Sequence, residues 1–301
     1  TLAVLAQWLF DGDEACTLRF VDKHWRCYFP DLTTPSSFNK RIRYLSGCLA
    51  YLGPLCALKC IELAGLTTDY ELLDGVGIKL TSQRKLTKKG LLKTGADLGI
   101  KGVPRSRFYG LKAVISAHPV GLITGYVFGP ASTEERWLCE GLLRWRCDMT
   151  LEQPCADSLE GTLGKRHRAK GKRRRGPAAM LEPSGLGKTV GGGVYVTDLG
   201  YRGKAWEAHW HREYGARIVH EGQLKDSAIS WRKRFKALRQ RVEHVIGAVG
   251  QGKEMAALAA RGRWTVKARI GARIARHNLN CWLNLLFKRK PLAAINPLTL
   301  A

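Results

Sequence analysis

Three acidic residues stand apart from the other acids of this chain, most of which occur near helix caps or on helices. Asp74 interrupts an apolar run, YELLDGVGIKL, and Asp198 ends another, GGGVYVTD. Glu243 lies in a long helical pattern between Val242 and Val245. Three carboxylates held close together repel one another and favour hard divalent cations with oxygen ligands, Mg²⁺ or Mn²⁺. We therefore expect a metal site, with the alternative that a strand-end aspartate only caps a helix or forms a turn.

The elements around these acids decide whether the three carboxylates can meet. Apolar, β-rich runs predict strands over 70–80, 107–118, 121–130, 191–198 and 216–220, and helical patterns cover 132–147, 204–215, 230–250 and 266–288. Three strands followed by alternating helices and strands predict an α/β fold, a ribonuclease-H-like mixed sheet flanked by helices. In this order the first and fourth strands can be neighbours, which places Asp74 beside Asp198. A helix packed across them can bring Glu243 to the same place.

The first 66 residues read as a small all-helical domain. SSFNKRIRYLSGCLAYL begins with a Ser cap and carries Arg41 and Arg43 ahead of an apolar stripe. Such a unit either binds DNA or supports the next domain as a bundle. The apolar stretch 45–66 is interrupted by Pro54, which favours a kinked pair of soluble helices over a membrane span.

The rest of the chain divides into a catalytic domain and a short tail. The domain covers 67–290, with 150–192 as a basic, mobile surface insertion because this stretch is rich in Gly, Pro, Lys and Arg without a hydrophobic period. The tail covers 291–301. Between the second and third strands, His118-Pro119-Val120 predicts a hairpin.

Net charge is the strongest compositional signal. The 301 residues hold 50 Lys and Arg against 25 Asp and Glu, a formal charge of +25. The basic residues cluster over 79–107, 165–175 and 232–241. Such an excess favours a polyanionic partner, and nucleic acid is the usual one. A merely solvated basic surface is the alternative.

Several other patterns predict no chemistry. PSGLGKT lacks the first glycine of a phosphate-binding loop and leads into a strand rather than a helix. His209 and His211 are two residues apart on a helix, so they point to different faces and do not form a metal pair. Trp206 and Trp210 share one helical face, which favours core packing. The nine scattered cysteines form no C-x-x-C pair, which fits reduced thiols in a cytosol.

Four blocks of the chain resemble successive blocks of the DDE-type transposases of bacterial insertion sequences, a group with a ribonuclease-H-like core. YELLDGVGIKL is similar to the strand that carries the first Asp of that family, and RFYGLKAVIS to the strand that follows. Asp198-Leu199-Gly200-Tyr201 resembles the D-x-G-Y block, and RQRVEHVIGAV holds the Arg and Glu of the Y-R-E-K type signature. The Tyr and Lys positions of that signature hold Lys236 and Gly250 here.

The resemblance implies a mechanism in which Asp74, Asp198 and Glu243 bind two Mg²⁺ or Mn²⁺ ions that clamp a scissile phosphate. It also implies DNA partners, the terminal inverted repeats of a transposon and a target duplex. The candidate DNA-binding residues are Lys112, Tyr201, Arg239, Arg241, Arg173, Arg174, Arg41 and Arg43. For Lys112 and Tyr201, surface charge and turn packing are the alternative interpretation.

The sequence thus predicts an Mg²⁺-dependent enzyme that cuts DNA at transposon ends and joins the 3′-hydroxyl ends to target DNA. We expect it in the bacterial cytoplasm with the nucleoid, away from membranes, and as a homodimer when assembled on DNA. Two alternatives stand beside this prediction. One is a related metal-dependent nuclease or integrase, and the other is a non-catalytic DNA-binding protein from a decayed or truncated element.

Overall fold

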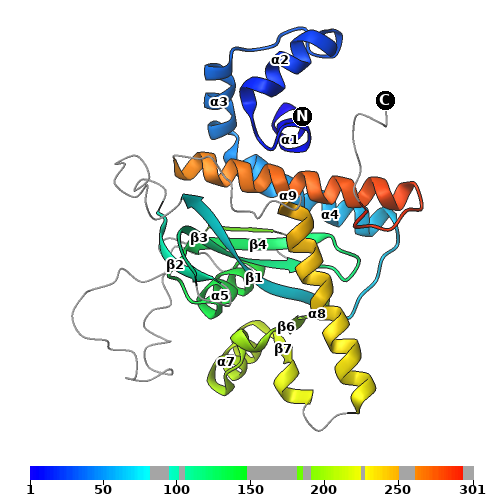
Figure 1. The fold of residues 1–301 in the computed structure, drawn as a ribbon. Helices are drawn as coiled ribbons and strands as arrows, with labels where there is room; N and C mark the ends of the chain where they lie inside the picture. Colours follow the sequence, from blue (N-terminus) through cyan, green and yellow to red (C-terminus); the bar gives the residue numbers. More distant parts are fainter. Residues whose placement is uncertain are drawn as a thin grey trace, which may run out of the picture.

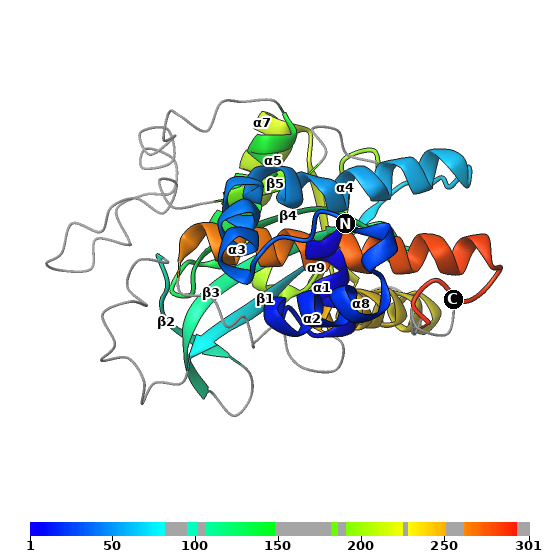
Figure 2. The same ribbon diagram turned by 90° about the horizontal axis from the view of Figure 1, so that it is seen from above.

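A mixed sheet with helices on both faces forms the body of the protein (Figure 1, Figure 2). The computed structural model describes residues 1–81, 95–101, 106–147, 182–185, 191–224, 228–250 and 262–293. The predicted α/β class is confirmed by this arrangement. Most of the segment 150–192, including Arg173 and Arg174, lies outside the described residues, as do 294–301.

The long strand β1 organises the seven-stranded sheet, whose order is β5-β4-β3-β1-β6-β7 with β2 paired to β3. β1 pairs antiparallel with β3 and parallel with β6, and β7 runs parallel to β6. β2 and β4 pair antiparallel with β3, and β5 pairs antiparallel with β4. The strands are β1 (Glu71–Thr81), β2 (Asp97–Lys101), β3 (Ser106–Ala117), β4 (Ile123–Pro130), β5 (Glu182–Gly185), β6 (Val194–Thr197) and β7 (Arg217–His220).

The five predicted strands and the hairpin between β3 and β4 are confirmed. The backbone N–H of His118 donates to Leu122 O at 2.8 Å and closes that hairpin. Two short strands were not predicted. β2 lies inside the basic stretch 79–107, and β5 lies inside 150–192, where we expected only an irregular insertion. Their sequences, DLGIK and EPSG, are too short to show a period-two pattern, so only pairing with a longer neighbour makes them strands.

Helices cover both faces of the sheet. α8 and α9 pack on one face, together with α4, and α5 and α7 pack on the other. The helices are α1 (Leu2–Leu9), α2 (Glu14–His24), α3 (Pro35–Tyr44), α4 (Ser46–Leu63), α5 (Glu135–Arg146), α7 (Lys204–Tyr214), α8 (Ile229–Gly250) and α9 (Arg263–Leu286). Short 3₁₀ helices lie at η1 (Arg26–Tyr28), η6 (Leu199–Tyr201) and η7 (Glu221–Leu224).

Side-chain alternation along β1 assigns its residues to these two faces. Val76 and Ile78 pack in the cluster that contains α8 and α9, whereas Leu73 packs with α5 and α7. Because side chains alternate with a period of two, Asp74 belongs to the α8 face and Gly75 to the α5 face.

α4 is a single helix rather than the kinked pair that we predicted. Pro54 has no N–H to donate to the carbonyl of Ala50 one turn earlier, and the hydroxyl of Tyr126 donates to that carbonyl at 3.1 Å. The Tyr126 hydroxyl thus supplies the hydrogen bond to Ala50 O that Pro54 cannot donate, and the helix continues past the proline. Among the described helices, α4 alone has the length and apolar composition of a membrane span, with 33% of its residues buried. One such helix is weak evidence for a membrane span, because length and composition alone define the criterion.

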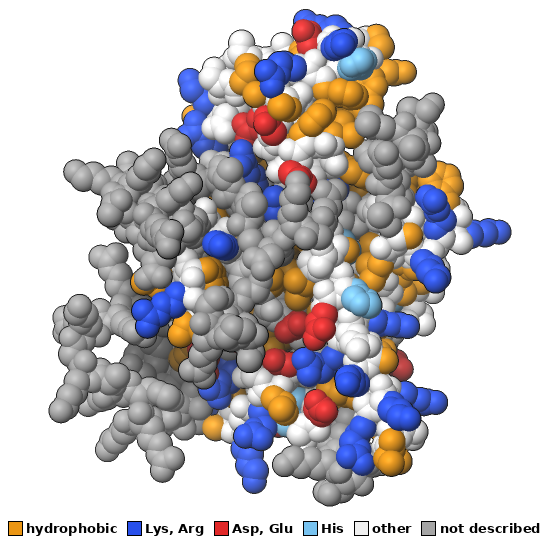
Figure 3. All heavy atoms as spheres, viewed as in Figure 1, with side chains coloured by type: hydrophobic (Ala, Val, Ile, Leu, Met, Phe, Trp, Pro, Cys, Tyr) orange, Lys and Arg blue, Asp and Glu red, His pale blue; other side chains and the backbone are white. Residues whose placement is uncertain are grey.

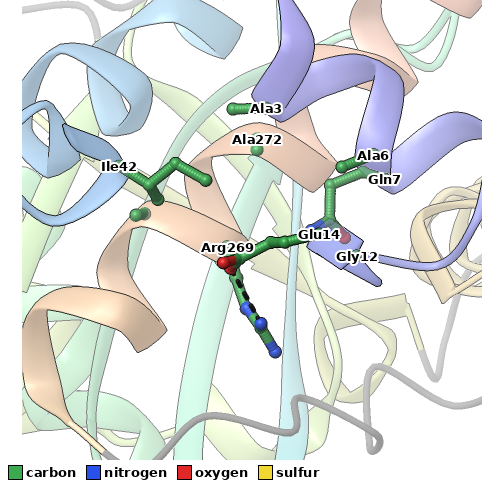
Figure 4. Close-up of a pocket in the computed structure, with 9 residues that line it drawn as sticks. Ala3, Ala6, Gln7, Gly12, Glu14, Ile42, Arg269 and Ala272 are labelled. Atoms are coloured by element: carbon green, nitrogen blue, oxygen red, sulfur yellow. Dashed lines mark hydrogen bonds and ion pairs between the residues drawn. The ribbon is translucent and has the colours of Figure 1, made fainter. Parts of the chain in front are cut away.

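The N-terminal helices pack on the outer side of α9, away from the sheet (Figure 1). Glu14 links α2 to α9 and α3, since it accepts from Arg269 at 3.0 Å and from Asn39 at 2.9 Å. The adjoining cavity is only about 10 Å³ (Figure 4). α3 is capped by Thr34 with Pro35 at its first position, not by the predicted serine. Together with the packing of α4 along α9, these contacts join the first 66 residues to the helical layer over the sheet.

Candidate active site

The two predicted aspartates are neighbours at the end of β6. The parallel pairing joins Glu71 to Tyr195 and Leu72 to Val196, so Asp74 and Asp198 lie level two residues further on. The predicted adjacency of their strands is confirmed. β6 ends at Thr197 while β1 continues, and no described strand pairs with β1 beyond Leu72 on this side. The aspartates therefore stand where β1 acquires an open edge.

Asp198 caps a turn, which was the alternative interpretation of this residue. Capping the turn does not remove Asp198 from the candidate site. Its Oδ1 accepts from the backbone N–H of Gly200 at 2.8 Å and caps η6. A carboxylate has a second oxygen with its own lone pairs, so capping does not exclude binding an ion.

Asp74 lies in an environment that opposes its negative charge. Burial raises the pKa of this carboxyl to about 7, against a hydrogen bond from the backbone N–H of Gly75 at 2.7 Å. The charges of Asp198 and Glu135 raise the pKa further, and that of Arg239 lowers it. An uncompensated carboxylate of this kind gains from a nearby cation.

Glu135, in the first turn of α5, is a fourth carboxylate that the sequence reasoning missed. It was counted among the acids that occur near helix caps or on helices. A methyl group built on Gly75 would lie 2.9 Å from its carboxyl carbon, and one built on Gly200 would lie 2.9 Å from its Oε2. Glu135 thus fills the space between β1 and η6 that the two glycines leave. The sequence signal for this space was a glycine shortly after each aspartate, Gly75 after Asp74 and Gly200 after Asp198.

Glu243 reaches the same place from α8. It lines a cavity of about 340 Å³ together with Asp74, Glu135 and Lys112, and Ile100, Phe108 and Ile246 form apolar parts of the wall. Its side chain is 56% exposed and pairs with Arg239, whose Nη2 lies 3.5 Å from Glu243 Oε1. The other guanidinium nitrogen of Arg239 lies 3.8 Å from Glu221 Oε2.

Lys112 lies in this cavity, whereas Tyr201 does not reach the surface. Lys112 Nζ is 3.6 Å from Glu135 Oε1, so the lysine faces the acids. Tyr201 is fully buried in the core formed by α5 and α7. The prediction that Tyr201 contacts the DNA backbone is therefore wrong for this conformation, because its hydroxyl has no path to a phosphate.

The donor set fits a hard divalent cation, although the acids are not gathered around a point. Within the described ranges, no three His, Cys, Asp or Glu side chains are close enough to hold one ion. Glu135 Oε2 and Asp198 Oδ1 flank one point beside Gly200, at 2.9 and 3.0 Å. They are thus at most about 6 Å apart, a span that two ions ~4 Å apart can bridge. Carboxylate oxygens are the ligands that Mg²⁺ and Mn²⁺ prefer.

Lys and Arg side chains lie along α8 on the face of the molecule that Figure 3 shows. The exposed residues of this helix include Arg232, Lys233, Arg234, Lys236 and Arg241. Trp231 is 59% exposed and lies beneath the guanidinium of Arg234, 5.7 Å from ring centre to carbon. Arg41 and Arg43 are also exposed, but on α3, which lies beyond α9 from the sheet. They do not belong to this cavity.

Other sequence interpretations concern α7 and are confirmed. Trp206 and Trp210 are buried in the core. His209 is buried, with Nε2 3.2 Å from Glu140 Oε1, while His211 is exposed, so the two histidines do not form a metal pair.

No protein-family model, curated protein or solved structure matches this chain.

Proposed function

We propose that this protein is a DNA transposase of the DDE type, which cuts phosphodiester bonds at transposon ends and joins the 3′-hydroxyl ends to target DNA. The observation that carries the proposal is the meeting of Asp74 and Asp198 on neighbouring parallel strands, in reach of a helix that carries Glu243. These are the acids that the resemblance to insertion-sequence transposases selects.

The topology supports a ribonuclease-H-like core. Three antiparallel strands, β1, β3 and β4, are followed by two parallel strands, β6 and β7, on the other side of β1. Helices on both faces complete that arrangement. The short strands β2 and β5 are additions at the periphery of the same order.

The proposed chemistry uses two divalent cations, Mg²⁺ or Mn²⁺, which when bound activate a water or a DNA 3′-hydroxyl and stabilise the leaving oxygen. Asp74, Asp198 and Glu243 would hold these ions. Asp74 must first give up the proton that its raised pKa retains near neutral pH. Arg239 orients Glu243 through their ion pair and is placed to donate to a phosphate oxygen.

DNA would reach the cavity along α8. Exposed Arg232 and Lys236 lie on the same face of α8 as Glu243, because they precede it by nearly whole numbers of helical turns, and backbone phosphates are their natural partners. Exposed Trp231 adds a flat aromatic surface near the start of the helix. Joining two transposon ends to one target requires two active sites, so we propose a homodimer on DNA.

The test is strand cleavage and transfer on oligonucleotides copied from the DNA that flanks the coding region. We expect Mg²⁺-dependent cleavage, and transfer of pre-cut 3′ ends into a target duplex. Asp198→Asn should abolish both while leaving DNA binding intact, because it removes a metal ligand without adding negative charge. Asp69→Asn, an exposed aspartate outside the cavity, is the matched control.

The outcomes separate the alternatives. Hydrolysis without strand transfer would favour a related nuclease or integrase. Unchanged cleavage by Asp198→Asn would refute the assignment of this site. DNA binding without any cleavage would favour a non-catalytic DNA-binding protein. The exposed Glu243 supports this candidate, because its carboxylate forms an ion pair with Arg239 and is not gathered with the other acids.

A further inference from the structure

We propose that Glu135 is a fourth carboxylate of the metal site, and that Lys112 is its resident cation, which a divalent ion replaces. This inference rests on the proposed function, but it assigns new roles to two residues. In this proposal, Asp74 and Glu243 line the site from the α8 face of the sheet. Glu135 and Lys112 line it from the α5 face.

The position of Glu135 is built by glycines. Its carboxylate occupies the space over Gly75 on β1 and beside Gly200 in η6, where a methyl group on either glycine would approach it to 2.9 Å. On β3, Lys112 pairs with Gly77 of β1, so no side chain stands between the lysine and the strand edge. Because Gly75 and Gly77 carry no side chains, Glu135 and Lys112 can both extend across the α5 face of β1 toward its open edge.

Glu135 does not serve its own helix. α5 has no side-chain capping hydrogen bond, and the residue at its N-cap position is Glu134. The Glu135 carboxylate instead turns toward the sheet, where burial raises its pKa and Lys112 opposes that increase. An acid in a first helical turn gains from the helix dipole while exposed. The dipole therefore does not explain why this one is partly buried among other acids.

The ion pair with Lys112 is loose. At 3.6 Å, Nζ is beyond the usual length of a charge-assisted hydrogen bond. Asp198 raises the pKa values of both Asp74 and Glu135, whereas Lys112 lowers that of Glu135 and Arg239 lowers that of Asp74. Arg239 is shared with Glu243 and Glu221, so these two cations do not balance the acids. A doubly charged ion can take the place of Lys112 and release the lysine toward a phosphate.

A buried hydroxyl gives independent support for a ligand here. Tyr201 is fully buried, and its oxygen has no hydrogen-bond partner among the described residues. Burial raises the pKa of this phenol, and the electrostatic contributions of Glu135, Asp74, Cys139 and Asp198 raise it further, so the hydroxyl is within the electrostatic range of the same acids. A buried donor without an acceptor is costly. Gathering the carboxylates around an ion would bring one of them within reach of it.

Direct titration with Mn²⁺ tests the proposal without relying on activity. We would measure Mn²⁺ affinity of the full chain by calorimetry and by the loss of the free-ion electron paramagnetic resonance signal. Glu135→Gln should weaken binding by roughly tenfold or more, as the loss of a metal-orienting group does. Lys112→Met should tighten it several-fold, because a competing cation is removed. Glu134→Gln and Lys204→Met, at exposed neighbouring positions, should leave the affinity unchanged.

The outcomes distinguish this inference from the proposed function. If Asp74→Asn and Asp198→Asn abolish Mn²⁺ binding but Glu135→Gln does not alter it, the metal site stands and the role of Glu135 is wrong. If none of the three changes binding, the site itself is wrong. Unfolding temperature monitors folding of each variant. Should Glu135→Gln fail to fold, Glu135→Asp keeps the charge and withdraws it by one methylene, and unchanged Mn²⁺ affinity in that variant would overturn the proposal.

Discussion

At the scale of single residues, Asp74 combines an unfavourable environment with a central position. A carboxyl that retains its proton to about pH 7 is poorly suited to stabilise the fold but well suited to respond to a cation. Asp198 also accepts one backbone N–H, but its hydrogen bond to Gly200 is exposed whereas that of Asp74 to Gly75 is partly buried. The two neighbouring aspartates therefore contribute differently to stability although they belong to one site.

The first prediction concerns the pH dependence of stability. Because the pKa of Asp74 is higher in the folded protein than in the unfolded chain, the folded state binds an extra proton between about pH 4 and pH 7. The free energy of unfolding should therefore fall as the pH rises through this range, by up to about 4 kcal/mol. Asp74→Asn should flatten that slope, as measured by urea denaturation in EDTA at a series of pH values.

Its control is Asp69→Asn, which should keep the slope of the unchanged protein. The charged groups acting on Asp74 are Asp198, Glu135 and Arg239, and none is altered in either variant. Added Mg²⁺ should remove much of the slope in the unchanged protein. An identical slope in Asp74→Asn and the unchanged protein would show that another group controls it.

Only some of the residues in the candidate site could be predicted from the sequence. The adjacency of Asp74 and Asp198 could be predicted, because strand order determines which strands are neighbours. Glu135 could not be selected in the same way, because its place depends on empty space over glycines from two other elements. Tyr201 was assigned to DNA with turn packing as the alternative, and its burial in the core formed by α5 and α7 favours the alternative.

At the scale of elements, close packing of α4 on α9 fixes the helical layer over the sheet. A methyl group on Gly271 of α9 would lie 2.5 Å from the carbonyl oxygen of Leu49 in α4, a contact with backbone that cannot move aside easily. Asn278 reinforces the layer, since its amide donates to Gly53 O at 2.7 Å and to Ile123 O at 2.9 Å. The sequence predicted both helices but not the glycine contact between them.

The second prediction compares two helical glycines. Gly271→Ala should destabilise the protein by about 1–3 kcal/mol, because α4 and α9 must move apart. Gly247→Ala, on the exposed face of α8 with nothing within 4 Å, should instead stabilise it by about 0.5–1 kcal/mol through helix propensity. Equilibrium denaturation measures both changes. Equal effects at the two positions would mean that the layer adapts to the added methyl group.

At the scale of the whole molecule, the net charge of +25 favours electrostatic attraction to DNA phosphates. Charge alone did not locate the contact surface, because basic clusters occur in several parts of the sequence. The structure places Arg232 and Lys236 on the face of α8 that carries Glu243, which lines the acidic cavity. Arg41 and Arg43 lie beyond α9, so any DNA that they bind is not at the cavity.

The third prediction is a change in the salt dependence of DNA binding. Replacing Arg232, Lys233 and Lys236 together by Gln should reduce the slope of log affinity against log salt concentration by roughly one unit per lost phosphate contact. Lys59→Gln, on α4 and paired with Glu62 at 2.7 Å, should leave the slope unchanged. Fluorescence anisotropy at several salt concentrations measures it. Equal slopes for both variants would exclude α8 as the DNA track.

The last described helix also bears on how the chain comes to be folded. α9 supplies Val266 and Ile270 to the core above the sheet, Ala268 to the core of the N-terminal helices, and Cys281 to a third cluster with α4. Each of these cores stays open until residues 263–286 have been synthesised. Residues 263–286 must therefore leave the ribosome before the first helices find their final partner, and a message cut short before α9 would yield a product without a finished interior.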